Sequence, residues 1–553
     1  MPSDNASSAP ENPVIPKAQE NPWYIRHFIK LLIGFGLGGG AVAILLPWML
    51  WLLCGMSSGS SDQLRLHLLY VTGGIIAVLT LLQTNWKNQG DRLKIDADIK
   101  KNEQDAEKNE RDHIRQVHAE RRSRYTAAVG QLADEKAAIR LGGIYTLTGL
   151  IDEWLADNTL SEEEQQKEGQ VIINNLCSYI RSPFPLVEKI DEYEARKELE
   201  ELESKKPDTL RPYVPPRLDA LRKRFEDSAE YQEPDNIAAL QAAFHEEQDV
   251  RRAIFEEMSK RSSKVSIDKN KEVTVTPGTW STFGFDFSRA PIFYPLNYLT
   301  IEQGNFVFAR FYGEADFLGA KFTRDAGFRS AEFTGNAVFW GAEFTGNADF
   351  RGAEFTGNAD FMNAKFARAA EFRNAKFTGD SVFWGAELTG RAGFWGAEFT
   401  GNADFMNAGF TGDAYFGGTG FTGDTNFGGT KFTGNADFMN VKFTGNANFE
   451  SAEFTGKANF RNSKFTSKTS FKGAYFKKYI PTFAGVSGAA QFSAQVDSQD
   501  YVFSVSRGSK PIDCGTATLG GRSFEIPLRA VLFDPGPWKE ETQDYDRFSD
   551  PAE

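Results

Sequence analysis

The 553-residue chain contains little cysteine, little histidine and no excess of positive charge. Its three cysteines, Cys54, Cys177 and Cys514, lie far apart and lack the CxxC spacing of a metal or redox site, which favours a reducing compartment. No histidine follows His245, so the C-terminal half lacks the residue that serves most often in acid-base catalysis. The net charge of -13 disfavours sequence-independent binding to a phosphate backbone.

Two long apolar runs lie near the N-terminus. Residues 31–56 contain no charged side chain, and residues 66–86 are similarly apolar, whereas a membrane-spanning helix needs about 20 such residues. We therefore expect two transmembrane helices within residues 28–87, preceded by a disordered tail over residues 1–27. A cleaved signal peptide is disfavoured because the first run is too long and a Pro-rich segment precedes it.

Lysine and arginine are distributed unevenly around these runs. Arg65 alone lies between the two runs, whereas basic residues lie on their outer sides: Lys17, Arg26 and Lys30 before the first run, and Arg92, Lys94, Lys100 and Lys101 after the second. The positive-inside rule then predicts a multi-pass protein of the inner cell membrane with both termini in the cytoplasm. Residues 34–39 also match GxGxxG, a dinucleotide-binding pattern, but no strand precedes them. Packing of Gly36 and Gly40 against Gly73 and Gly74 is the expected role.

Residues 88–124 are about half charged and contain acid-base pairs four apart, which indicates a solvated stalk helix. A coiled coil or homo-oligomer is left open because the apolar positions of this segment are sparse. Helical periodicity then predicts an α-helical domain over residues 125–262, with a charged, Pro-containing insertion near 183–234. Adjacent acids in this domain, such as Asp152 with Glu153 and Glu246 with Glu247, are interpreted as surface charge rather than as catalytic pairs.

Phenylalanine recurs with great regularity between Phe306 and Phe476. The spacing alternates between five and six residues, and 31 of the 32 positions are Phe, the exception being Leu388. Alanine stands two residues before this position in 24 cases. A right-handed coiled coil also has an eleven-residue period, but its apolar spacings are three and four and it would not tolerate a glycine in nearly every repeat. Short strands, with Ala and Phe on the same side, fit the pattern.

The segment AEFTGNADFRGAEFTGNADF resembles the pentapeptide-repeat family. This resemblance implies a right-handed quadrilateral β-helix with the small and large residues inside, and the chain departs from the usual pattern by its six-residue steps. Four faces, alternately of the shorter and the longer step, make one coil, so the repeat is expected to form seven to eight coils. The predicted fold class is thus a membrane α-hairpin, an α-helical domain and this β-helix.

The β-helix is expected over residues 263–480, a C-terminal cap over 481–533 and a loose acidic tail over 534–553. An open β-helix also needs its first coil protected, and the aromatic residues before Phe306, such as Trp280 and Phe283, are candidates for that cap.

No residue is predicted to be catalytic, to bind a cofactor or to bind a metal, and no nucleic acid partner is expected. Residues 301–480 contain 19 acidic and 19 basic residues, so the β-helix is neutral as a whole. We expect a non-enzymatic membrane-anchored scaffold that presents the β-helix to a protein partner. The alternative, suggested by the family resemblance, is a DNA mimic that inhibits or protects a nucleic-acid enzyme. The first predicts a role for Arg351, Arg373 and Lys376, and the second for Asp349, Asp360, Asp404 and Asp437.

Overall fold

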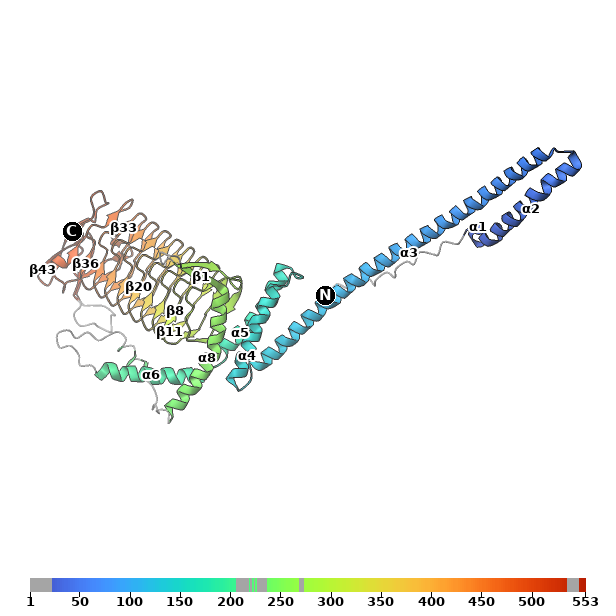
Figure 1. The fold of residues 1–553 in the computed structure, drawn as a ribbon. Coiled ribbons are helices and arrows are strands. Elements are labelled where there is room, and N and C mark those ends of the chain that lie inside the picture. Colours follow the sequence, from blue (N-terminus) through green and yellow to red (C-terminus); the bar gives the residue numbers. More distant parts are fainter. Residues whose placement is uncertain are drawn as a thin grey trace, which may run out of the picture. The chain divides into compact units, whose positions relative to one another are not determined.

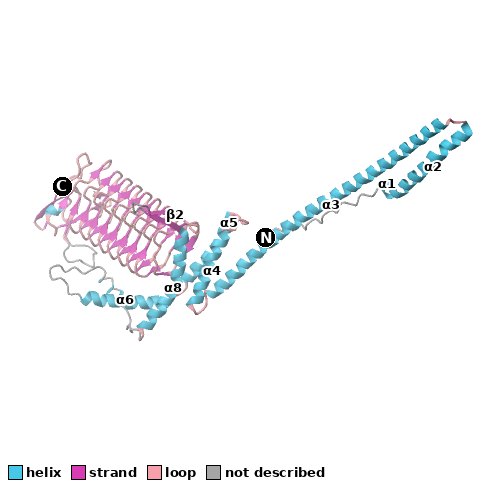
Figure 2. Ribbon diagram, viewed as in Figure 1, coloured by secondary structure: helices cyan, strands magenta, loops and turns pink. Residues whose placement is uncertain are grey.

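The computed structural model describes residues 22–204, 218, 221–222, 224–225, 236–267, 273–534 and 547–553. Within these residues seven helices are followed by a four-sided parallel β-helix, which confirms the predicted order of helical and β regions (Figures 1 and 2). Contacts divide the chain into two compact units, Met1–His118 and Ala119–Glu553.

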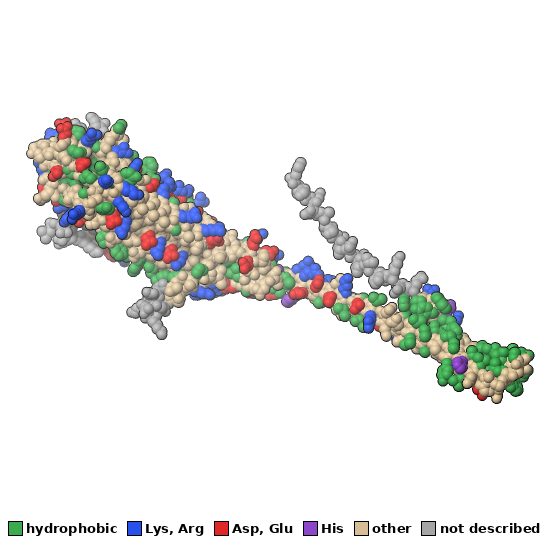
Figure 3. Space-filling model, turned by 90° about the horizontal axis from the view of Figure 1, so that it is seen from above, with side chains coloured by type: hydrophobic (Ala, Val, Ile, Leu, Met, Phe, Trp, Pro, Cys, Tyr) green, Lys and Arg blue, Asp and Glu red, His purple; other side chains and the backbone are tan. Residues whose placement is uncertain are grey.

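The first unit is made of apolar and charged helices. It contains α1 (Trp23–Arg26), α2 (Phe28–Cys54) and most of α3 (Ser58–Gln131). Both α2 and α3 are long and apolar enough to cross a membrane. Figure 3 shows hydrophobic side chains gathered over α2 and the start of α3, and charged side chains over the later part of α3. The second apolar run and the stalk therefore form one continuous helix of 74 residues.

Two sequence predictions for this unit need correction. Disorder over residues 1–27 is wrong for α1, where the Pro22 carbonyl accepts the N–H groups of Ile25 and Arg26 at 2.9 and 3.2 Å; residues 1–21 lie outside the described part. The predicted glycine contacts are also wrong. Gly36, Gly40, Gly73 and Gly74 have open space around them, whereas Gly39 leaves no room for a Cβ beside Thr72. Gly39 is therefore the glycine of α2 that a side chain of α3 contacts.

The helical domain of the second unit consists of the last turns of α3 together with α4 (Ala137–Leu155), α5 (Glu162–Arg181), α6 (Pro185–Ser204) and α8 (Ile237–Ser262). α5 begins at a capping box, in which the Ser161 hydroxyl and the Glu164 carboxylate each accept the other residue's backbone N–H. α6 lies inside the predicted charged insertion. Its Val187 and Ile190 are buried with Phe184 and Phe244, so this part of the insertion is packed rather than loose.

The helices close the N-terminal end of the β-helix. After α8 comes an antiparallel hairpin, β1 (Ser263–Ile267) and β2 (Val273–Pro277), and then the first coil at β3 (Gly284–Asp286). The Gln170 side chain of α5 donates to the Gly284 carbonyl at 2.7 Å and accepts its N–H at 3.0 Å. The Phe255 ring of α8 lies 5.3 Å from that of Phe287. Trp280 and Phe283, the predicted cap, lie between β2 and the first coil and contact the helices, since Trp280 donates its indole N–H to Asp152 of α4 at 3.1 Å. Residues 284–305 belong to the first coil, because their strands stack on the next coil as the repeats do.

The β-helix, here called the rod (residues 284–533), has four walls, each named after one strand of a single coil. The β14 wall contains β3, β6 (Gln303–Asn305), β10 (Ala326–Gly327), β14 (Ala348–Asp349), β18 (Ala370–Glu371), β22 (Ala392–Gly393), β26 (Ala414–Tyr415), β30 (Ala436–Asp437) and β34 (Ala458–Asn459). The β16 wall opposite it contains β8 (Ala315–Asp316), β12 (Ala337–Val338), β16 (Ala359–Asp360), β20 (Ser381–Val382), β24 (Ala403–Asp404), β28 (Thr425–Asn426), β32 (Ala447–Asn448), β36 (Thr469–Ser470) and β41 (Tyr501–Val502).

The other two walls alternate with these along the chain. The β15 wall contains β4 (Pro291–Ile292), β7 (Arg310–Phe311), β11 (Glu332–Phe333), β15 (Glu354–Phe355), β19 (Lys376–Phe377), β23 (Glu398–Phe399), β27 (Gly420–Phe421), β31 (Lys442–Phe443), β35 (Lys464–Phe465), β40 (Gln491–Ser493) and β44 (Val531–Phe533). The β17 wall contains β5 (Thr300–Ile301), β9 (Lys321–Phe322), β13 (Glu343–Phe344), β17 (Lys365–Phe366), β21 (Glu387–Leu388), β25 (Gly409–Phe410), β29 (Lys431–Phe432), β33 (Glu453–Phe454) and β37 (Tyr475–Phe476).

Neighbouring strands in each wall pair in parallel and in register, as Phe333 does with Phe355 one coil further along the chain. The walls reach nine to eleven strands, more than the expected seven to eight coils, because residues before Phe306 and after Phe476 add strands at both ends. The Phe rings stack in four columns; Phe405, for example, lies 4.9 Å from both Phe383 and Phe427. This aromatic core is continuous with the core of the helical domain.

The two step lengths correspond to two kinds of corner. In the five-residue step, the residue two after Phe has a positive φ, as at Asn407 (58°), a conformation that Gly and Asn adopt readily. In the six-residue step, the extra residue lies in the Thr-Gly-Asn-Ala corner. A Cβ on Gly412 there would collide with the backbone of Gly390 in the preceding coil. Glycine at this corner is therefore required by close backbone stacking.

The C-terminal end is closed by the segment after β37. It contains a small hairpin, β38 (Ala484–Gly485) with β39 (Gly488–Ala489), a short helix η1 (Ser498–Asp500), and the hairpin β42 (Cys514–Leu519) with β43 (Arg522–Pro527). The expectation of a loose tail over 534–553 is wrong for residues 547–553. The Ala552 N–H donates to the Ala530 carbonyl, and Thr516 donates its N–H to Glu553 at 2.9 Å, because the cap offers free edge groups. Residues 535–546 lie outside the described part.

Candidate interaction surface

The four walls share one core but differ in their outward side chains. On the β15 and β17 walls, basic and acidic residues pair between coils, such as Lys376 with Glu354 at 2.8 Å and Lys321 with Glu343 at 3.2 Å. These exposed pairs contribute little to stability, but they neutralise their walls.

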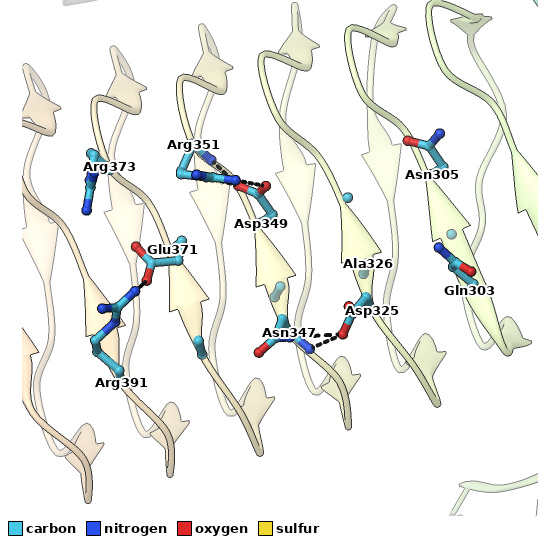
Figure 4. A pocket seen from close by; sticks show the side chains of 14 residues that line it. Gln303, Asn305, Asp325, Ala326, Asn347, Asp349, Arg351, Glu371, Arg373 and Arg391 are labelled. Carbon is cyan, nitrogen blue, oxygen red and sulfur yellow. Dashed lines mark hydrogen bonds and ion pairs between the residues drawn. The ribbon is translucent and has the colours of Figure 1, made fainter.

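The β14 wall contains a shallow groove of about 470 Å³ (Figure 4). Within it, Asp349 accepts hydrogen bonds from Arg351 at 2.7 and 2.8 Å and from Arg329 at 3.1 Å. Burial alone would raise the pKa of Asp349, but these arginine hydrogen bonds outweigh burial and lower it. Arg391 pairs with Glu371 in the same groove. Asp349 and Glu371 are therefore already neutralised by arginines, whereas the third acid of the groove, Asp325, accepts hydrogen bonds from Asn347.

An apolar strip lies on the β16 wall. It consists of the residue that follows Phe in five successive coils: Leu318, Trp340, Met362, Trp384 and Met406. All five side chains are at least partly exposed, and Trp340 retains 47% of its accessible surface. Val338 and Val382, also partly exposed, face outward beside the two tryptophans. A contiguous apolar strip of this kind marks a binding surface more often than isolated exposed residues do.

From β8 to β28, the charged residues of the β16 wall are all acidic. Residues 314–318, 336–340, 358–362, 380–384, 402–406 and 424–428, which form this wall over six coils, contain six acids and no Lys or Arg: Glu314, Asp316, Asp360, Asp380, Asp404 and Asp424. None of the six forms an ion pair with any residue that the structure describes. Asp360 and Asp404 are held in place, because each accepts the N–H of the methionine two residues on, at 2.8 and 2.9 Å.

Comparison with protein families agrees with this architecture. Residues 306–354, 350–398, 394–438, 410–453 and 427–475 match the family described as pentapeptide repeats (9 copies). Residues 306–475 of the rod are a pentapeptide-repeat domain. No curated protein and no solved structure matches the chain.

The pentapeptide-repeat domain distributes the sequence-predicted residues over several walls. Arg351 and Arg373 flank the β14 wall, but Lys376 lies on β19 of the adjacent β15 wall, so these three do not form one surface. The four aspartates proposed for DNA mimicry are also divided. Asp349 and Asp437 lie on the β14 wall, and Asp360 and Asp404 lie on the β16 wall opposite.

Neither the strip nor its unpaired acids were predicted from the sequence, because the acidic and basic totals of the whole repeat are equal and conceal an acidic wall. The signal is nevertheless present in the sequence. Every fourth Phe lies on the same wall, and the residues that follow these Phe residues include Trp340, Met362 and Trp384.

Carboxylates of the helical domain take part in ion pairs that hold it together. Glu247 accepts hydrogen bonds from Arg140 and Arg251 at 2.9 and 2.8 Å, and Asp152 accepts from Arg261 at 2.7 Å. Arg251 is buried and also donates to the Ile180 carbonyl. Among the described residues, no group of three or more His, Cys, Asp and Glu could hold a metal ion.

Proposed function

We propose that the protein is a non-enzymatic, membrane-anchored scaffold that presents its pentapeptide-repeat domain to a protein partner in the cytoplasm. The observation that carries this proposal is the contrast between core and surface. The inward positions repeat almost without change, whereas the outward positions differ from wall to wall, which suits recognition of a partner by one wall. The proposed anchor is α2 with the apolar part of α3, and the basic residues around them favour cytoplasmic termini.

A second candidate, DNA mimicry, gains some support from the acidic β16 wall. Its charge density is low, however. Six acids over six coils of about 4.8 Å each give one charge per roughly 5 Å, whereas duplex DNA carries one per about 1.7 Å. Tryptophan and methionine also lie among these acids. The scaffold therefore fits the wall better than a phosphate mimic does.

The anchor and its orientation can be tested by cysteine labelling in intact cells. In a Cys54→Ser background, Ser58→Cys should react with a membrane-impermeant maleimide, and a tag after Glu553 should be accessible only after permeabilisation. The protein should also resist alkaline extraction from membranes. Release by alkali would refute the anchor, and an external tag with an unlabelled Ser58→Cys would refute the orientation.

A further inference from the structure

We propose that the β16 wall binds a cationic amphipathic helix, which lies along the rod axis with its apolar face on the strip. The inference rests on the proposed docking function and names the chemical class of the partner. Three features of the wall carry it: the apolar strip, the unpaired carboxylates beside the strip, and the spacing of its side chains.

The apolar strip supplies the contact area. Its five residues occupy adjacent coils, so the strip is about 19 Å long at about 4.8 Å per coil. Trp340 and Trp384 lie two coils apart, each in a coil whose outward strand residue is valine rather than aspartate. Trp is among the residue types most enriched at positions that dominate binding energy. The strip therefore offers two anchor residues separated by a methionine.

The unpaired acids select the charge of the partner. The carboxylates on the other three walls include several in ion pairs with their own walls, as Asp349 does with Arg351. On the β16 wall, Asp360 and Asp404 alternate with the two valines, and Asp380 lies at the adjoining corner. Lysine or arginine at the edges of an apolar face would meet these carboxylates, while an anionic partner, including an anionic lipid surface, would be repelled.

The coil spacing favours a helix over an extended peptide. An α-helix repeats its facing side chains about every 5.4 Å, close to the coil step, whereas an extended strand repeats them about every 6.8 Å. Two helical turns, about 10.8 Å, approximate the two-coil separation of Trp340 and Trp384. A helix of about 13 residues, with apolar side chains at i, i+4, i+7 and i+11, covers the strip.

The test uses the full-length protein in zwitterionic detergent and a fluorescent 14-residue peptide of Leu and Lys arranged with this apolar period. Binding is followed by anisotropy. Trp340→Ala combined with Trp384→Ala should weaken binding about tenfold or more. Trp395→Ala is the matched control, because Trp395 is also exposed but lies on the β14 wall, and it should leave binding unchanged. Binding of the peptide to detergent micelles is the same for all variants, so differences in anisotropy between variants measure binding to the β16 wall.

The charge contribution is tested with a conservative pair. Asp360→Asn combined with Asp404→Asn keeps the oxygen that accepts the methionine N–H, so the fold should be retained. Affinity should fall about threefold or more at low salt, and the difference should shrink as salt is added. The control is Asp437→Asn on the β14 wall, where Asp437 accepts the Met439 N–H in the same way, at 3.1 Å.

Three results would overturn the inference. One is equal binding of a scrambled peptide of the same composition, or of a Leu and Glu peptide. Another is an equal loss of binding in the control variants. The third is a dimer of the protein that dissociates in the Trp340→Ala, Trp384→Ala variant, which would identify a second copy as the occupant. Membrane extraction and cysteine labelling test the anchor separately, so failure of one proposal leaves the other distinguishable.

Discussion

Serine replaces the usual alanine at two buried positions of the rod, and we expect the same substitution to have opposite effects at the two. Ser463 donates its hydroxyl to the carbonyls of Phe438 and Phe460, both at 2.8 Å. Ser381 is 1% exposed, and its hydroxyl has no hydrogen-bond partner among the described residues. Ser463 follows a five-residue corner, where the hydroxyl meets a carbonyl of the preceding coil, whereas Ser381 follows a six-residue corner.

The magnitudes follow from the cost of burying polar groups. Ser463→Ala removes a satisfied hydrogen bond and should lower the free energy of unfolding by about 1 kcal/mol. Ser381→Ala removes an unpaired buried hydroxyl and should raise it by about 1 kcal/mol. For a rod of this size, each change corresponds to a shift of about 2 to 4 °C in the melting temperature.

Thermal unfolding of the purified full-length protein, followed by circular dichroism in the β region, measures both shifts. Opposite signs are expected, with Ser381→Ala melting above the wild type and Ser463→Ala below it. If both variants melt lower by the same amount, the hydroxyl of Ser381 is satisfied in solution and the distinction between the two corners is refuted.

Three further predictions concern the rod. Phe405→Ala should lower the free energy of unfolding by about 3 to 5 kcal/mol, measured by denaturant titration, because its ring is fully buried between two stacked rings; a loss below about 1 kcal/mol would contradict the packed core. Asn402→Asp places a carboxylate between Asp380 and Asp424, and their charges raise the pKa of the new carboxyl group. The variant should therefore melt increasingly below the wild type as pH rises through that pKa, and a melting-temperature difference that is independent of pH would contradict the repulsion. Asp349→Asn should lower the melting temperature near neutral pH, because the lowered pKa of Asp349 in the folded protein contributes stability that is present above the unfolded pKa and lost as pH falls. The difference from the wild type should therefore disappear in acid, and a difference that stays constant with pH would exclude the arginine pairing.

Asn402 is exposed, but it also contacts the coils on either side of its own. In the structure its oxygen accepts the Asp424 N–H at 3.0 Å and its own N–H donates to Asp380 at 2.8 Å. From Asn358 to Asn446, Asn and Asp alternate in this column, so like charges are not adjacent. This spacing becomes visible only when residues one coil apart are known to be stacked.

The repeat itself could be predicted because its constraints are local and periodic. Ala and Phe two apart identify the inward side of each strand, and even Leu388, the one departure, is buried as expected. The caps could not be predicted in the same way. Contacts such as Gln170 with Gly284 join segments that are far apart in the chain and leave no periodic trace in the sequence.

The shared core limits how the rod can be separated from its neighbours. Phe255 of α8 packs on Phe287 of the first coil, so residues 265–533 expressed alone would expose rings and strand edges that the helices cover. A soluble fragment that keeps this shared core must therefore begin before α4.

The alternation of five- and six-residue steps determines by how many residues the repeat can lengthen or shorten during evolution. Loss or duplication of one short and one long step together preserves the order of steps and therefore the aromatic core, but it advances the chain by half a coil. Every later residue of the β14 wall would then move to the β16 wall, and the apolar strip with its neighbouring acids would be divided between two opposite walls. A change by one whole coil leaves each wall in line. Selection acting on one wall should therefore tolerate whole-coil changes and remove half-coil ones, although the two are equally compatible with folding.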